Sequence, residues 1–152
     1  NKQYSIDKYR IFSFTKNETE HIIYKYDTLA GNFLKLDDMQ LYVYGERDAH
    51  FTYNSHLISA VGLVFGGASG YLMHKDQNFL YIVTPFIYTT LTLPFGTKIK
   101  QQSSIKNKGF LKKDEYLHGY DRVARSKRTT NALKSSFVGM GVGFLISVIL
   151  NN

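Results

Sequence analysis

The segments LISAVGLVFGGASGYLM (residues 57–73) and FLYIVTPFIYTTLTLPF (residues 79–95) each contain 17 residues without a formal charge. Five polar residues, 74–78, separate them. A bilayer-spanning helix needs roughly 17–25 mostly apolar residues, so the two segments predict a helical hairpin that crosses a membrane and returns. A third apolar segment, residues 132–150, carries its one charge at Lys134. The expected fold is mainly α and integral to a membrane, with three apolar helices: a hairpin plus a C-terminal helix.

The more polar parts of the chain predict additional elements. Residues 9–15 and 20–27 are rich in aromatic and branched side chains and flank a polar break, which predicts a small N-terminal β-hairpin. A turn follows around Gly31, and Asp37 is expected to cap a long helix that continues without a stop to His74. The expected division of the chain is a β-hairpin region at 1–36, the long helix and membrane hairpin at 37–97, a basic loop and amphipathic helix at 98–130, and a C-terminal membrane helix at 131–152.

The net charge of +7 comes from one segment. Residues 1–48 contain seven Lys and Arg against eight Asp and Glu, whereas residues 98–130 contain ten against three. A basic segment beside membrane helices is typical of a cytoplasmic loop or of a contact with anionic lipid headgroups. Nucleic acid is not an expected partner, because no motif that reads it is present. The residues expected to contact lipid or an acidic partner are Arg122, Arg125, Lys127, Arg128 and Lys134.

Small residues recur every fourth position in the first and third apolar segments. They are Gly62, Gly66 and Gly70, and then Ser135, Gly139, Gly143 and Ser147. A spacing of four places residues on one helix face, where a missing Cβ lets another backbone approach closely. Glycine is also simply frequent in membrane helices. The pattern predicts helix packing, either between the first and third segments running in the same direction or against a second copy of the chain.

The second apolar segment contains both prolines of the chain. Pro94 is expected to end a helix, and Pro85 to kink it unless that proline lies in the first turn. The hydroxyls of Thr89, Thr90 and Thr92 can bond to carbonyls of their own helix or line a polar path. Local bonding is the favoured interpretation.

Two short elements resemble each other. YGERDA (residues 44–49) precedes the first apolar segment, and HGYDRVA (residues 118–124) precedes the third. Both combine a glycine, an acid, an arginine and an alanine, through a duplicated origin or through chance. Glu46 and Asp48 are expected to pair with a neighbouring arginine or with basic residues of the second element, forming a structural clasp.

Three motifs also carry a family resemblance. YDTLAGNFL (residues 26–34), YGERDA and YLHGYDRVARSKR (residues 116–128) resemble small membrane or envelope proteins of Bacteroidota, which have a "GErDA" element before one hydrophobic segment and Y-x-x-G-Y-x-x-x-A-x-x-K-R before another. The resemblance extends over about residues 9–150 and implies no activity. It implies export by a signal peptide, which would place the basic segment outside, against the positive-inside rule. We expect a multi-pass protein of the cell envelope, with the inner membrane favoured over a periplasm-facing or outer-membrane-associated position.

The sequence offers no catalytic or metal-binding constellation. It contains no cysteine, and no two of its five histidines are four residues apart. Phosphate-loop, dinucleotide and nucleophile-elbow motifs are absent, so no cofactor is expected. The expected function is a non-enzymatic, membrane-embedded accessory or structural subunit whose partners are other membrane or envelope proteins. A homo-oligomeric pore or transporter component is the alternative.

Overall fold

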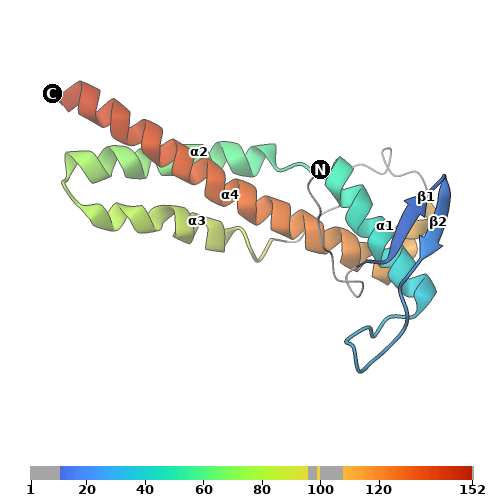
Figure 1. Ribbon diagram of the computed structural model, residues 1–152. Coiled ribbons are helices and arrows are strands. Elements are labelled where there is room, and N and C mark those ends of the chain that lie inside the picture. Colours follow the sequence, from blue (N-terminus) through green and yellow to red (C-terminus); the bar gives the residue numbers. More distant parts are fainter. Residues whose placement is uncertain (1–10, 96–98, 100–107, 152) are drawn as a thin grey trace, which may run out of the picture.

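The computed structural model describes residues 11–95, 99 and 108–151. The elements follow in the order β1 (Ser13–Lys16), β2 (Thr19–Ile22), α1 (Leu36–Thr52), α2 (His56–Lys75), η2 (Phe79–Val83), α3 (Thr84–Leu91), η3 (Lys108–Lys112) and α4 (Asp114–Asn151). Figure 1 shows an elongated molecule in which α4 runs across α2 and α3 and continues beside α1 to the strands. We call the strands, α1, η3 and residues 114–128 of α4 the head, and α2, η2 and α3 with residues 129–151 the apolar part.

The predicted β-hairpin is present, with shorter strands than expected. β1 and β2 pair antiparallel and are joined by Asn17 and Glu18, which have φ angles of 49° and 64°. Two positive φ angles are what a two-residue type I′ hairpin turn requires, and asparagine tolerates this conformation better than most residues. Below the strands, the rings of Phe12 and Tyr24 lie 5.9 Å apart and are mostly buried.

The prediction of one uninterrupted helix from Asp37 to His74 is wrong. α1 ends at Thr52, Tyr53 has an extended backbone, and α2 begins three residues after that tyrosine. Tyr53, Asn54 and Ser55, which form the break, have modest helix propensity. Carbonyl groups at the end of α1 accept hydrogen bonds from the side chain of Lys127 instead of continuing the helix. The N-cap position of α1 is Lys35, which makes no side-chain capping bond, so the prediction that Asp37 caps the helix is wrong. Asp37 and Asp38 lie in the first turn, where their negative charges interact favourably with the helix dipole.

The second apolar segment is less helical than expected. It begins as the 3₁₀ helix η2 and continues as the eight-residue α3, in which Pro85 occupies the first turn and therefore causes no kink. Eight α-helical residues rise only about 12 Å. By length and composition, two helices of the described chain, α2 and α4, are long enough to cross a membrane.

Helix α4 joins the head to the apolar part. It has 38 residues and contains both the amphipathic helix expected before residue 131 and the expected C-terminal apolar helix, as one continuous helix. Its first half packs against α1 and its second half against α2. A helix of this length rises about 57 Å, long enough to belong to both parts of the molecule.

The apolar part has small residues inside and large apolar residues outside. The small residues buried in α2 and in the second half of α4 are Gly62, Gly66, Ser69, Gly70, Ala132, Ser136, Gly139, Gly143 and Ser147, and Met140 is the one large side chain buried with them. By contrast, Phe65, Val138 and Leu145 are 52%, 59% and 61% exposed. The core of a soluble protein has the reverse arrangement.

Candidate functional site

The first close crossing lies in the head, between α1 and α4. A Cβ added to Gly45 would overlap the carbonyl oxygen of Tyr116, and one added to Gly119 would overlap the carbonyl oxygen of Tyr42. The two backbones are therefore in direct contact, which only glycine permits at these positions. Such contacts bring Cα–H groups within reach of carbonyl oxygens.

The second crossing lies in the apolar part, between α2 and α4. Four glycines each face a carbonyl oxygen of the other helix: Gly66 faces Ser136, Gly70 faces Met140, Gly139 faces Leu63, and Gly143 faces Gly67. The two predicted small-residue stripes thus pack against each other within one chain. The partner numbers rise together along both helices, so α2 and α4 run parallel.

Both crossings follow the same reciprocal rule. The glycines form pairs, Gly45 with Gly119 in the head and Gly66 with Gly139 in the apolar part. In each pair, each glycine faces the backbone carbonyl of the residue that lies three positions before the other glycine. Two parallel helices related by a local two-fold axis produce this pattern. The partner spacing is 74 residues in the head and 73 in the apolar part, and the break at residues 53–55 lies between the two crossings.

The second crossing is tightly packed at one end and closed by a polar contact at the other. At one end, a Cβ on Gly62 would meet the Ser135 hydroxyl oxygen and the ring of Tyr88. At the other end, His74 Nδ1 and Ser147 Oγ lie 3.1 Å apart. All seven residues predicted for helix packing therefore lie along the interface of α2 and α4.

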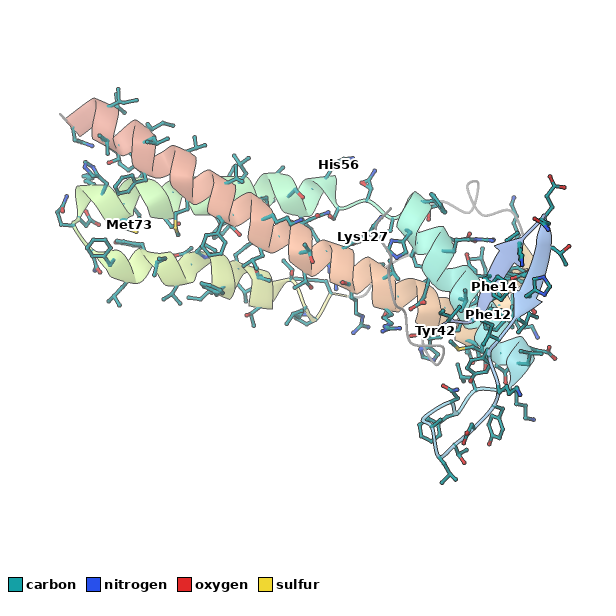
Figure 2. The ribbon with its side chains drawn as sticks, viewed as in Figure 1. Phe12, Phe14, Tyr42, His56, Met73 and Lys127 are labelled. Carbon is teal, nitrogen blue, oxygen red and sulfur yellow. The ribbon has the colours of Figure 1, made fainter. Side chains whose placement is uncertain are left out.

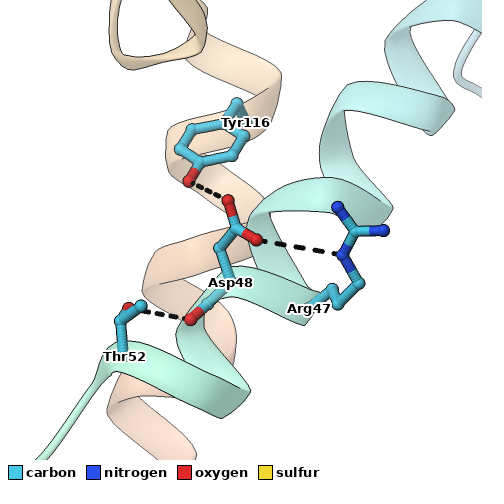
Figure 3. A network of polar contacts seen from close by, with 4 residues as sticks. All are labelled: Arg47, Asp48, Thr52 and Tyr116. Atoms are coloured by element: carbon cyan, nitrogen blue, oxygen red, sulfur yellow. Dashed lines mark hydrogen bonds and ion pairs between the residues drawn. The ribbon is translucent and has the colours of Figure 1, made fainter. Parts of the chain in front are cut away.

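The expected clasp between the two similar elements is present. Arg122 Nη1 donates to Glu46 Oε1 at 2.8 Å. Figure 3 shows the second part of the clasp, in which the fully buried Tyr116 donates its hydroxyl proton to Asp48 Oδ2 at 2.9 Å and Arg47 lies on the other carboxylate oxygen at 3.8 Å. Burial, followed by the hydrogen bond to Asp48, raises the pKa of Tyr116 well above its usual range.

The five predicted basic residues have different surroundings. Arg122, Arg125 and Lys134 are exposed, although Arg122 pairs with Glu46 and Arg125 forms an ion pair with Asp121. These three side chains keep access to a headgroup or to an acidic surface.

Lys127 faces inward, at the break between α1 and α2 (Figure 2). Its Nζ donates to the carbonyl of His50 at 2.6 Å and to those of Ala49 and Tyr53 at 3.4 Å each. Ala49 and His50 lie in the last turn of α1, and Tyr53 is the residue that follows its end; the carbonyl of Ala49 also accepts from the backbone N–H of Tyr53. Carbonyls at the end of a helix need such donors from outside its regular hydrogen-bond pattern. Lys127 therefore caps α1, and a positive charge suits that helix end.

Arg128 is buried where the head meets the apolar part. Arg128 is only 2% exposed, so its side chain cannot reach a lipid headgroup in this fold. The prediction that Arg128 contacts lipid or an acidic partner is therefore wrong. Its Nη2 donates to the carbonyl of Leu93 at 3.4 Å, and its Nε has no hydrogen-bond partner among the described residues. A buried and incompletely paired charge is costly.

The threonines of the second apolar segment bond locally, as favoured from the sequence. Thr89 donates to Pro85 O at 2.7 Å, Thr90 to Phe86 O at 2.9 Å, and Thr92 to Thr89 O at 2.7 Å. None of these hydroxyl protons is left for a polar path.

Sequence reasoning missed the tyrosines of the head crossing. Tyr42 and Tyr116 each supply the carbonyl that faces the partner glycine. The signal was a repeated Y-x-x-G, present as Tyr42–Gly45 and again as Tyr116–Gly119. It also missed Asn131, whose side-chain amide donates to Ser55 Oγ at 2.8 Å and helps fix the break between α1 and α2.

An open groove of about 400 Å³ lies on the head. It is lined by Val43, Glu46, Arg47, His50, Phe51 and Val123. No group of three or more His, Asp or Glu side chains suited to a metal ion occurs among residues 11–95, 99 and 108–151. Comparison with protein-family models, with curated proteins and with solved structures finds no match to this chain.

Proposed function

We propose that this protein is a non-enzymatic, membrane-embedded structural or accessory subunit that holds a helical head at the surface of a cell-envelope membrane, within a complex of other membrane or envelope proteins. The observation that carries the proposal is the continuity of α4. One 38-residue helix is locked by glycine crossings to α1 in the head and to α2 in the apolar part. Such a construction fixes the orientation of the head relative to a membrane. The inner membrane is the proposed location.

The proposed topology has three passages through the bilayer. α2 and α4 are parallel and both leave from the head, so the chain between them must return to the head side. It does so as η2, α3 and the residues up to Phe95, packed along α2 and α4, with the hydroxyl of Tyr88 donating to Ile58 O at 2.5 Å. The outward-facing bulky side chains of the apolar part would then face lipid, for which they are suited.

In this proposal a protein partner binds the exposed bulky face of the apolar part or the head, and not the glycine stripes. Both glycine stripes are used within the chain, and a pore is not supported, because the threonine hydroxyls that would line it are bonded to backbone carbonyls. The exposed bulky face and the head remain available to a protein partner. Arg122, Arg125 and Lys134 remain available to anionic headgroups, and each such charge contributes about 1 kcal/mol near an anionic surface.

Two experiments test the proposal. Because the chain has no cysteine, single cysteines at Gln77 and at Lys113 can be labelled from either side of sealed vesicles. We expect opposite sidedness; labelling of both from the same side contradicts the topology. Purification in a mild detergent should yield a heterologous partner, whereas a lone monomer or a ring of identical copies contradicts the subunit role.

A further inference from the structure

The connection between β2 and α1 is a well-ordered loop. The backbones of Asp27 and Asn32 bond to each other twice, at 2.8 and 3.1 Å. The Asp27 carboxylate accepts from the backbone N–H groups of Leu29 and Ala30 at 3.0 and 3.2 Å, and Gly31 supplies the positive φ angle of 84° that closes the turn. We call residues 26–33 the apolar loop.

The apolar loop presents large hydrophobic side chains to the outside. Leu29 is 99% exposed, Phe33 71% and Tyr26 58%. Two further bonds fix the base of the loop, from the Tyr24 hydroxyl to Leu34 O at 2.8 Å and from the Asn32 side chain to Lys25 O at 3.0 Å. The conformation is therefore held by polar bonds, and the side chain of Leu29 contributes nothing to it. Exposed apolar groups gathered on one loop mark a contact surface.

The position of the loop indicates what that surface contacts. In Figure 1 it leaves the head near the start of α1, on the side opposite the connection to α2, and its tip bends along the length of the molecule in the direction of the apolar part. We propose that the apolar loop inserts its tip into the interfacial layer of the same bilayer that holds α2 and α4. This inference rests on the membrane insertion proposed above.

The charges around the loop indicate how it binds. Lys25 and Lys35 are offset by Asp27, Asp37 and Asp38, so the loop carries no excess of positive charge. Attachment then comes from burial of apolar side chains, as in interfacial segments that bind through apolar area. Binding should not require anionic lipid, in contrast to a lysine-rich lipid-binding segment.

The experiment places an environment-sensitive fluorophore, NBD, on a single cysteine at Leu29 in protein reconstituted one copy per nanodisc of phosphatidylcholine. The fold tolerates this change, because the side chain touches nothing. We expect a blue-shifted emission that is strongly quenched by phosphatidylcholine carrying a doxyl group near its headgroup. The signal should be unchanged when phosphatidylglycerol is added. Asn17→Cys in the hairpin turn serves as the exposed control, and Val138→Cys on α4 as the membrane control.

Three results would overturn the inference. A label at position 29 that behaves like the one at position 17 shows that the loop stays in water. A blue shift without doxyl quenching shows a protein contact instead, and a shift that appears only with phosphatidylglycerol shows electrostatic rather than apolar attachment. If the label at Val138 is also unquenched, the membrane insertion itself fails, which separates that failure from failure of the loop alone.

Discussion

Glycine-mediated contact between α2 and α4 can be tested with two substitutions only two residues apart. Gly143 and Gly141 lie in the same helix, but Gly143 is buried against α2 and Gly141 is exposed. A Cβ built on Gly143 would lie 1.9 Å from the carbonyl oxygen of Gly67, whereas one built on Gly141 has nothing within 4 Å. Gly143→Ala and Gly141→Ala therefore add the same methyl group with opposite consequences for packing.

The expected magnitude follows from the overlap. Real Cβ atoms essentially never come closer than 3.0 Å, so the two backbones would have to separate by about 1 Å in Gly143→Ala. Forcing extra volume into a close-packed site costs about 1–3 kcal/mol. Replacing a helical glycine by alanine otherwise gains up to about 1 kcal/mol. We expect Gly141→Ala to be neutral or stabilising. The free energy of unfolding of Gly143→Ala should be roughly 1–3 kcal/mol lower than that of Gly141→Ala.

The assay is reversible unfolding of the purified protein in mixed micelles of mild detergent and increasing dodecyl sulfate, followed by circular dichroism. Gly66→Leu and Gly139→Leu should prevent recovery of the folded protein, because a larger side chain separates the helices along a whole turn. Leu63→Ile leaves the glycine faces intact and should be tolerated. Equal stability of Gly143→Ala and Gly141→Ala would refute the argument that close backbone approach holds the apolar part together.

Three further substitutions test the head and its junction with the apolar part. Tyr116→Phe removes the buried hydrogen bond to Asp48 and should cost about 1–2 kcal/mol. Folding raises the pKa of Tyr116 above its ordinary value of 10. The stabilisation that the protonated Tyr116 hydroxyl gives is therefore complete below about pH 10 and is lost as the pH rises through the raised pKa. The free energy of unfolding should fall at alkaline pH in the wild-type protein, and it should fall less in Tyr116→Phe. Lys127→Gln should speed hydrogen exchange in the last turn of α1 while Arg125→Gln does not; equal rates would contradict the capping role. Arg128→Met should be neutral or stabilise by up to about 4 kcal/mol, whereas a strong loss of stability would show that the buried guanidinium has a favourable partner.

Composition and spacing were sufficient for the main features of the fold. Long apolar runs, the second of them interrupted only by Lys134, identified α2 and the second half of α4. Fourfold spacing placed Gly66 and Gly139 on packing faces, because that signal depends only on helix periodicity. The clasp of Glu46 and Arg122 was predictable because the two elements share a pattern.

Features set by tertiary contact were not predictable in the same way. The break at residues 53–55 has no proline or glycine to announce it, and it depends on Lys127 and Asn131, more than 70 positions later in the chain. Arg128 looked like a surface charge by composition, and only its place on the inner face of α4 buries it. The second apolar segment had a spanning length, but its 3₁₀ start and early proline shortened the α-helix.

Because α4 is continuous, a change in its tilt within the apolar part also moves the head. From Gly139 in the second crossing to Asp114 at its start, the helix extends over 25 residues, about 38 Å. A membrane helix adjusts to a thinner or thicker bilayer by changing its tilt. If α4 tilts by about 10° around the glycine crossing, its far end moves by roughly 6–7 Å, and the strands move with it. The same rigid connection that fixes the head would thus convert a small change in membrane thickness into a displacement large enough to make or break a contact with a neighbouring protein.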